Sequence, residues 1–184
     1  MRLSGTALDP LLSAYLTDGV HQDSFRIDSI DVDGPDATAK CRMTSAAVSK
    51  TDSGGFHLTA PTVFRMAGQL LVVHGQVLFG FESKQVEVWV KEHALKHRRP
   101  VRHAEGIEVR ARITSWRTGF KNPEMFGFSY EVTIEDDAVV GHGQAFFDLG
   151  AVPDAASRIE RAIFSLERST ACRQSLPAAL ASST

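Results

Sequence analysis

The residues best placed to do chemistry lie in and just before a long apolar segment, residues 61–81. Arg65, Gln69 and Gln76 interrupt that run and fall together on a helical wheel, which predicts a buried helix with one narrow polar stripe. His57 precedes the helix, where a histidine is a tunable base. A glutamine amide orients a water or a carbonyl but cannot donate a proton as an acid. We therefore expect chemistry on this stripe.

Each of these residues also has a structural interpretation. His57 could be an ordinary loop histidine, and Arg65 and Gln69 could form a solvated or interface stripe. His74 falls inside the apolar arc of the helix, so a hydrogen-bonded core histidine is favoured over a catalytic one. His142 lies in an alternating strand pattern on what should be an exposed or interface face.

Length and composition describe an ordinary globular protein. The 184 residues carry a formal net charge of −2, and 43% of them are hydrophobic, which predicts one domain with a proper core. Cys41 and Cys172 form no CxxC or Cys/His ligand spacing, so we expect a reduced, cytoplasmic protein without a metal site. No signal peptide, membrane segment or nucleic-acid-binding pattern is apparent.

The remaining elements follow from hydrophobic periodicity and turn residues. The segment 83–99 has apolar residues at helical spacing, with a strand through VEVWV as the alternative. The pattern further predicts a short helix at 10–16, a hairpin of strands 25–32 and 37–43, a flexible approach at 44–55, strands at 107–116, 126–134 and 138–149, and a C-terminal helix at 153–170.

This order predicts an α+β fold. An antiparallel sheet of about five strands needs its apolar face covered, and the 61–81 helix is the only element apolar enough to cover it. A sheet wrapped around one long central helix is the hotdog architecture. We expect one hotdog domain over residues 1–184, with its core at about 20–150, extra flanking helices and a loose tail at 177–184.

Three segments resemble the acyl-thioester hotdog superfamily, and within it the FcoT-type (type III fatty acyl-CoA thioesterase) family. They are FHLTAPTVFRMAGQLLVVHGQ, the expected extra helix KQVEVWVKEHALKHRRP, and FSYEVTIEDDAVVGHGQAFFDL. The resemblance implies a homodimer or dimer of dimers that acts on an acyl thioester of CoA or of an acyl carrier protein, without a further cofactor. It also implies that backbone N–H groups around Thr62, Val63 and Phe64 hold the thioester carbonyl.

The side chains of this chain differ from those of the families it resembles. FcoT-type proteins carry a tyrosine before the helix and an asparagine early in it, where this chain has His57 and Arg65. Dehydratase relatives pair a loop histidine with a helix carboxylate, where this chain has His57 and Gln69. Both the dehydratase and the thioesterase roles therefore lack the expected carboxylate.

A basic run at residues 91–103 is the other local signal, and Arg99 and Arg102 are its central candidates. A solvated helix end would explain it, and so would a docking patch for CoA phosphates or an acidic carrier protein.

Taken together, the sequence predicts a thioesterase. A dehydratase or conjugate-addition lyase acting on a carrier-bound 3-hydroxyacyl or enoyl chain is the alternative enzyme, and a non-catalytic acyl-binding or partner subunit is the alternative of another class. The predicted catalytic residues are His57, Gln69 and Arg65, and the predicted substrate-binding residues are Thr62, Val63, Phe64, Gln76, Arg99 and Arg102.

Overall fold

The computed structural model describes residues 23–46, 55–119 and 122–174, so the predicted helix at 10–16 and the tail at 177–184 lie outside the described residues. In chain order the elements are β1 (Ser24–Asp33), β2 (Asp36–Ser45), α2 (Ala60–Leu78), β3 (Val88–His97), β4 (Ile107–Thr118), β5 (Met125–Ile134), β6 (Val139–Asp148) and α3 (Ala155–Gln174). No helix among them is long and apolar enough to cross a membrane.

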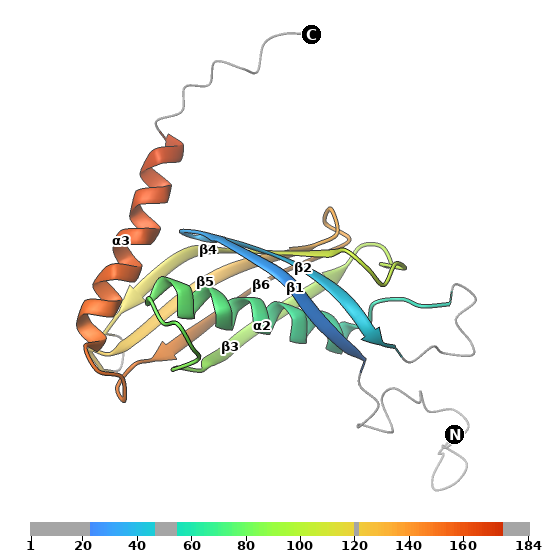
Figure 1. Cartoon of the computed structure of the whole chain (residues 1–184). Coiled ribbons are helices and arrows are strands. Elements are labelled where there is room, and N and C mark those ends of the chain that lie inside the picture. The colour runs from blue at the N-terminus through green and yellow to red at the C-terminus, as the bar shows by residue number, and fades with distance from the viewer. Residues whose placement is uncertain (1–22, 47–54, 120–121, 175–184) are drawn as a thin grey trace, which may run out of the picture.

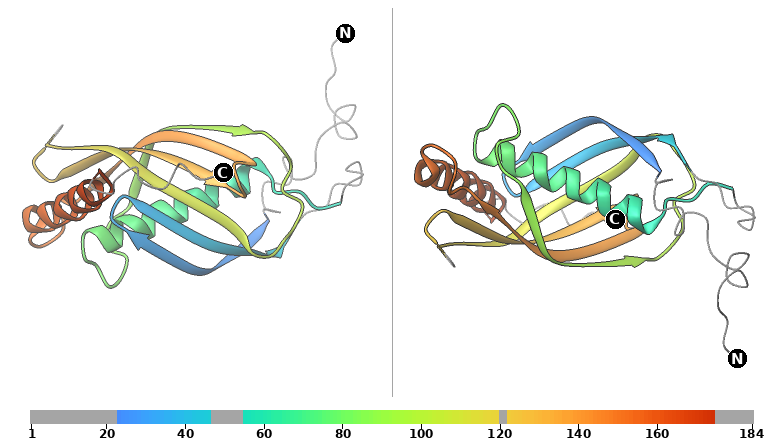
Figure 2. Two further views of the ribbon diagram at one scale, coloured as in Figure 1. Left: turned by 90° about the horizontal axis from the view of Figure 1, so that it is seen from above. Right: turned by 90° about the horizontal axis from the view of Figure 1, so that it is seen from below.

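The six strands form one antiparallel sheet in the order β1-β2-β4-β5-β6-β3. The sheet curves around α2, which lies along its concave face (Figure 1). Seen from below in Figure 2, α2 lies in front of the sheet, so one side of the helix is left uncovered by strands. This is the predicted α+β hotdog fold, with six strands in place of about five.

The sixth strand is β3, and the prediction of a helix over 83–99 was wrong. β3 pairs with β6 from Val88 opposite Phe147 to His97 opposite Val139, with a bulge between Val90 and Glu92. The bulge inserts one residue, so the positions that face α2 are 88, 90, 93 and 95. The step from position 90 to position 93 is three residues long, and apolar residues three apart are also typical of a helix. The extra helix expected from the family resemblance is therefore a strand.

The central helix α2 has Pro61 in its first turn, where the fixed φ of proline suits a helix and the missing N–H costs nothing. The helix ends at Leu78, three residues earlier than predicted. Two residues further on, Gly80 adopts a positive φ of 70°, a conformation that commonly terminates helices. Val63, Met66 and Leu70 are completely or almost completely buried. Each such side chain contributes about 1.5–3 kcal/mol by leaving water.

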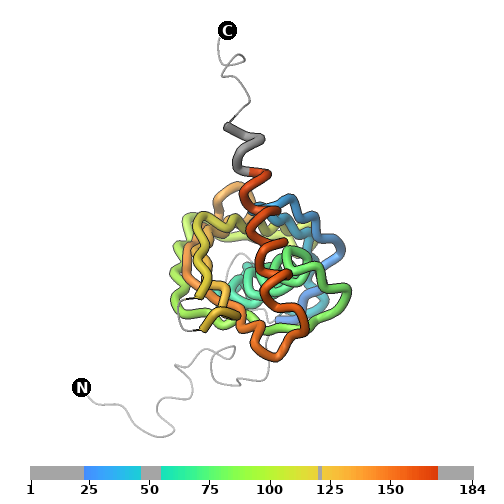
Figure 3. The backbone as a smooth tube through the Cα atoms, turned by 90° about the vertical axis from the view of Figure 1, so that its left-hand side faces the viewer, coloured from blue at the N-terminus to red at the C-terminus, as the bar shows by residue number. Residues whose placement is uncertain are grey.

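The C-terminal helix α3 follows the predicted amphipathic pattern, with Ile159, Ala162 and Leu166 buried. It lies at one end of the sheet and passes in front of the sheet and α2 in Figure 3. Arg158 joins α3 to the end of α2, because its Nη1 donates to the carbonyl oxygen of Phe79 at 3.0 Å. The helix thereby covers the C-terminal end of α2.

Candidate functional site

The N-terminus of α2 offers fewer backbone donors than the sequence suggests. Thr59 is the N-cap, with φ −82° and ψ 153°, and Pro61 has no N–H group. The N–H of Val63 donates to the carbonyl oxygen of Thr59 at 2.9 Å, so its predicted role as an oxyanion donor is wrong. The first N–H groups of a helix have no acceptor within it, and in this first turn they belong to Ala60 and Thr62.

A buried carboxylate that was not among the predicted site residues, Asp23, lies at this helix terminus. Oδ2 of Asp23 accepts hydrogen bonds from the hydroxyls of Thr59 and Thr62, both at 2.9 Å. Asp23 is 5% exposed and Thr62 is 1% exposed. A carboxylate is favoured at the positive end of a helix dipole. The cluster therefore places a negative charge and two hydroxyls beside the first-turn N–H groups.

Arg65 holds the backbone of Asp23 against the helix. Its Nη1 donates to the backbone carbonyl oxygen of Asp23 at 2.6 Å, and its guanidinium lies 5.4 Å from the ring centre of Phe25. These two contacts fasten the start of β1 to the second turn of α2. The structure thus places Arg65 where it positions Asp23, next to the predicted site.

The other two predicted catalytic residues lie on either side of this cluster. His57 is half-buried and precedes the N-cap by two residues. Gln69 has an exposed side chain and lies two helical turns beyond Thr62, about 10 Å along the axis. The polar group buried at the helix terminus is therefore Asp23, whereas the amide of Gln69 faces outward.

Two polar residues within α2 have structural partners. The side chain of Gln76 is buried and holds the connection to β3, since its Nε2 donates to the carbonyl oxygen of Val86 at 2.8 Å and its Oε1 accepts from the N–H of Gln85 at 2.9 Å. His74 is fully buried, and its Nε2 donates to the carbonyl oxygen of Gly34 at 2.8 Å. The predicted core histidine is confirmed, and the contacts of Gln76 are with the segment that joins α2 to β3.

A second polar pair, which the sequence analysis did not identify, faces α2 from the sheet. The hydroxyl of Tyr130 on β5 lies 2.6 Å from Nδ1 of His93 on β3, with the rings stacked at 5.8 Å. Burial raises the pKa of Tyr130 to about 12. Burial, with a smaller contribution from His142, lowers the pKa of His93 below its usual value. Both side chains are therefore neutral at physiological pH.

The two partners meet because the strand between them carries a glycine. Tyr130 is opposite Gly143 on one side of β6, and His93 is opposite Gly143 on the other. A Cβ at Gly143 would lie 2.5 Å from the hydroxyl of Tyr130 and would overlap the carbonyl oxygen of Glu92. The glycine thus lets the tyrosine hydroxyl reach across β6. The alternation Gly141-His142-Gly143 is the sequence signal that could have revealed this.

This pair adjoins the helix site through Phe64. The rings of Phe64 and His93 are 4.9 Å apart in an edge-to-face arrangement, and Phe64 is 43% exposed. Nε2 of His93 is inaccessible to solvent and has no hydrogen-bond partner in the part of the chain that the structure describes. A polar atom that is buried without a partner is uncommon in folded proteins.

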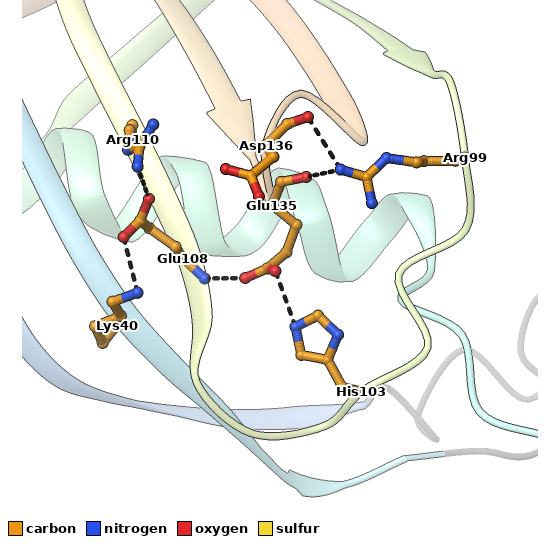
Figure 4. A network of polar contacts seen from close by, with 7 residues as sticks. All are labelled: Lys40, Arg99, His103, Glu108, Arg110, Glu135 and Asp136. Atoms are coloured by element: carbon orange, nitrogen blue, oxygen red, sulfur yellow. Dashed lines mark hydrogen bonds and ion pairs between the residues drawn. The ribbon is translucent and has the colours of Figure 1, made fainter.

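In the basic run, Arg99 and His103 contact the turn between β5 and β6 (Figure 4). Between them the carbonyl oxygen of Val101 accepts from the N–H of Leu58 at 2.9 Å, one residue before the N-cap of α2. Nη2 of Arg99 donates to the carbonyl oxygens of Glu135 at 2.6 Å and Asp136 at 3.0 Å. Nε2 of His103 lies 3.0 Å from a carboxylate oxygen of Glu135. Glu135 and Asp136 have positive φ values of 52° and 47°, which non-glycine residues rarely adopt. The hydrogen bonds from Arg99 therefore stabilise an unfavourable turn conformation. Arg102 is exposed nearby in the chain.

A groove of about 540 Å³ crosses the opposite face of the sheet. Lys91, Ser115, Arg117, Ser129 and Gln144 contribute to its lining. It is separated from α2 by the sheet itself. Within the described ranges no group of three or more His, Cys, Asp or Glu side chains is arranged to hold a metal ion.

Comparison with known proteins shows similarity only at the level of structure, since no family model and no curated protein matches the chain. The thioesterase SAV0944 of Staphylococcus aureus is 12% identical, with 73% of this chain and 99% of that one covered and a TM-score of 0.45. The PaaI protein from the phenylacetic acid degradation operon of E. coli is 13% identical, covering 66% and 77%, with a TM-score of 0.40. The smu.793 protein of Streptococcus mutans, solved with acetyl CoA, is 11% identical, covering 70% and 90%, with a TM-score of 0.41. Such likeness concerns the fold alone, and membership of the FcoT-type family stays a prediction.

Proposed function

We propose that this chain hydrolyses an acyl thioester at the N-terminus of α2. The observation that carries the proposal is the carboxylate of Asp23, buried at the positive end of the central helix between the hydroxyls of Thr59 and Thr62. A general base beside first-turn N–H donors is the combination that acyl transfer to water requires.

In this mechanism the thioester carbonyl oxygen lies against the N–H groups of Ala60 and Thr62. Asp23 takes a proton from a water molecule, and the water oxygen adds to the carbonyl carbon. The helix dipole stabilises the negative charge that develops on the carbonyl oxygen. The carbon–sulfur bond then breaks, and the leaving thiolate takes the proton from Asp23. The products are a carboxylic acid and a free thiol.

Dehydration of a 3-hydroxyacyl thioester is the second candidate, because Asp23 supplies the carboxylate that is absent at Gln69. In this reaction His57 would remove a proton from carbon 2, and Asp23 would protonate the hydroxyl that leaves carbon 3 as water. The same groups acting in reverse would add water to an enoyl chain.

The carrier of the acyl group is CoA or an acyl carrier protein in this proposal, and Arg99 and Arg102 remain the candidate docking cations. A homodimer is also proposed, because β3 is at the edge of the sheet and pairs only with β6 among the described strands. An unpaired edge of this length favours pairing with a second copy.

The decisive experiment compares three single variants on a panel of acyl and 3-hydroxyacyl thioesters. Thiol release reports hydrolysis, and absorbance of the conjugated enoyl thioester reports dehydration. We expect Asp23→Asn to reduce thiol release by about 10²–10⁴-fold. Gln69→Ala should change it little, because the amide faces outward.

The outcome for His57→Gln separates the two reactions. A large loss of dehydration with hydrolysis retained would assign His57 to the lyase reaction. Wild-type hydrolysis in Asp23→Asn would contradict the proposed site. A wild-type protein that binds acyl thioesters but turns none of them over would favour the non-catalytic acyl-binding subunit.

A further inference from the structure

We propose that His93 selects acyl chains that carry an oxygen atom at carbon 3, a 3-oxo or a 3-hydroxyacyl thioester, by donating a hydrogen bond from Nε2 to that oxygen. This inference rests on the proposed function and names its substrate class. It also assigns a role to a residue pair that the hydrolytic mechanism does not use.

In the proposed arrangement the hydroxyl of Tyr130 donates to Nδ1 of His93, and this direction sets which nitrogen of His93 is the donor. The tyrosine hydroxyl has one proton, and the acceptors near it are Nδ1 of His93 at 2.6 Å and the carbonyl oxygen of Glu92 at 3.5 Å. A contact of 3.5 Å is too long for an effective hydrogen bond, so Nδ1 is the better acceptor for the hydroxyl proton. A neutral imidazole that accepts at Nδ1 carries its proton at Nε2. Nε2–H is then a buried donor without a partner among the described residues.

His93 lies close to where the first carbon atoms of the acyl chain would be in the proposed mechanism. Its ring contacts Phe64, which follows Ala60 by one helical turn, about 6 Å along the axis. A carbonyl held at Ala60 and Thr62, with the acyl chain running along α2, places carbon 3 two bonds further along, toward Phe64. His93 is thus beside the first carbon atoms of the chain.

The surroundings explain why the selection would be strong. The rings of Phe64 and His93 meet edge-to-face, and Phe64 is 43% exposed, so in the proposal a ligand reaches Nε2 when this ring turns toward solvent. A ligand oxygen would satisfy Nε2–H, whereas an unsubstituted chain would leave this donor buried and unpaired. A site built to bond a polar group discriminates against ligands that lack it. We expect a preference of roughly 10- to 100-fold in kcat/KM.

The kinetic test compares hexanoyl, 3-oxohexanoyl and 3-hydroxyhexanoyl pantetheine thioesters. His93→Phe should reduce kcat/KM for the two oxygenated substrates more than for hexanoyl, so that the preference disappears. His93→Gln, which keeps an N–H donor, should restore part of it. His97→Gln is the matched control, since it removes an exposed histidine from the end of the same strand. A preference that survives in His93→Phe would overturn the inference.

A second measurement is independent of turnover. In ¹⁵N-histidine spectra of the wild type, His93 should show a protonated Nε2 and an acceptor Nδ1, and Tyr130→Phe should abolish this single tautomer. A non-hydrolysable dethia analogue with a 3-oxo group should shift the Nε2 resonance, and the same analogue without that group should not. If no thioester is hydrolysed but this shift appears, the proposed hydrolysis fails and the role of His93 stands. If the two analogues have the same effect, the role of His93 fails.

Discussion

The ring of Phe147 on β6 lies against the backbone of α2 at Gly75. A Cβ built at Gly75 would overlap this ring, so the glycine is what allows the sheet to approach the helix so closely. The same ring stacks on Phe128 at 5.4 Å and meets Phe79 edge-on at 5.1 Å. The contact therefore fixes the depth at which α2 lies in the sheet.

Substitution of Gly75 by alanine should destabilise the protein, whereas the same substitution at Gly68 should stabilise it. Both glycines are inside α2, so each gains about 0.5–1 kcal/mol of helix propensity. Gly68 has no neighbouring atom within 4 Å of an added Cβ, but at Gly75 the overlap with Phe147 should cost about 1–3 kcal/mol or more. Urea unfolding measures both changes. Equal free energies of unfolding for the two variants would show that the Phe147 contact is not tight.

Acidification should destabilise the fold through His74. Burial lowers the pKa of His74 and outweighs the hydrogen bond to Gly34 and the charge of Asp36, whereas the unfolded chain titrates near 6.5. Between these two pKa values the unfolded state binds more protons, so stability that is present above about pH 6.5 is lost as the pH falls. His74→Gln keeps a donor for Gly34 and does not titrate. The free energy of unfolding of this variant should therefore fall less between pH 7 and pH 5 than that of the wild type.

Charge reversal at Arg99 and at Arg102 should raise KM for a CoA or carrier-protein thioester and flatten its salt dependence, with kcat little changed. Arg99→Glu should also lower the midpoint of thermal unfolding, because Arg99 braces the turn at Glu135 and Asp136. Steady-state kinetics at two salt concentrations, with a thermal melt of each variant, separate the two effects. An unchanged KM in both variants would leave Arg99 with its structural role alone.

The protein should behave as a dimer of twice its 20.1 kDa chain mass in light scattering. Trp89 lies on the edge strand β3 and is 58% exposed in the single chain, so pairing with a second copy should bury it. On dilution the fluorescence of Trp89 should then shift to longer wavelength, and Trp89→Phe should remove the shift. A strict monomer at micromolar concentration would contradict the proposed dimer.

Hydrophobic periodicity was sufficient to predict a helix or strand where the same face of the segment is buried along its length. The buried face of α2 follows the helical period from Val63 to Leu78, and side chains alternate between buried and more exposed positions from Ile107 to Ile113 in β4 and along most of β6. The same reasoning failed for β3, because one inserted residue near Lys91 changes which side chains face inward. A bulge is set by pairing with a neighbouring strand, and the period of a single strand does not contain it.

By itself the sequence determined the class of fold and the end of the central helix at which chemistry is expected, because apolar periodicity and the proline at position 61 act locally. Only the tertiary structure decided which side chains meet there. Asp23 lies 36 residues from Thr59 and 39 from Thr62, and Tyr130 lies 37 residues from His93. These contacts depend on the order of the strands in the sheet and on a glycine in the strand between two partners. The free energy of such packing is shared among many distant residues, so no local stretch of sequence encodes it.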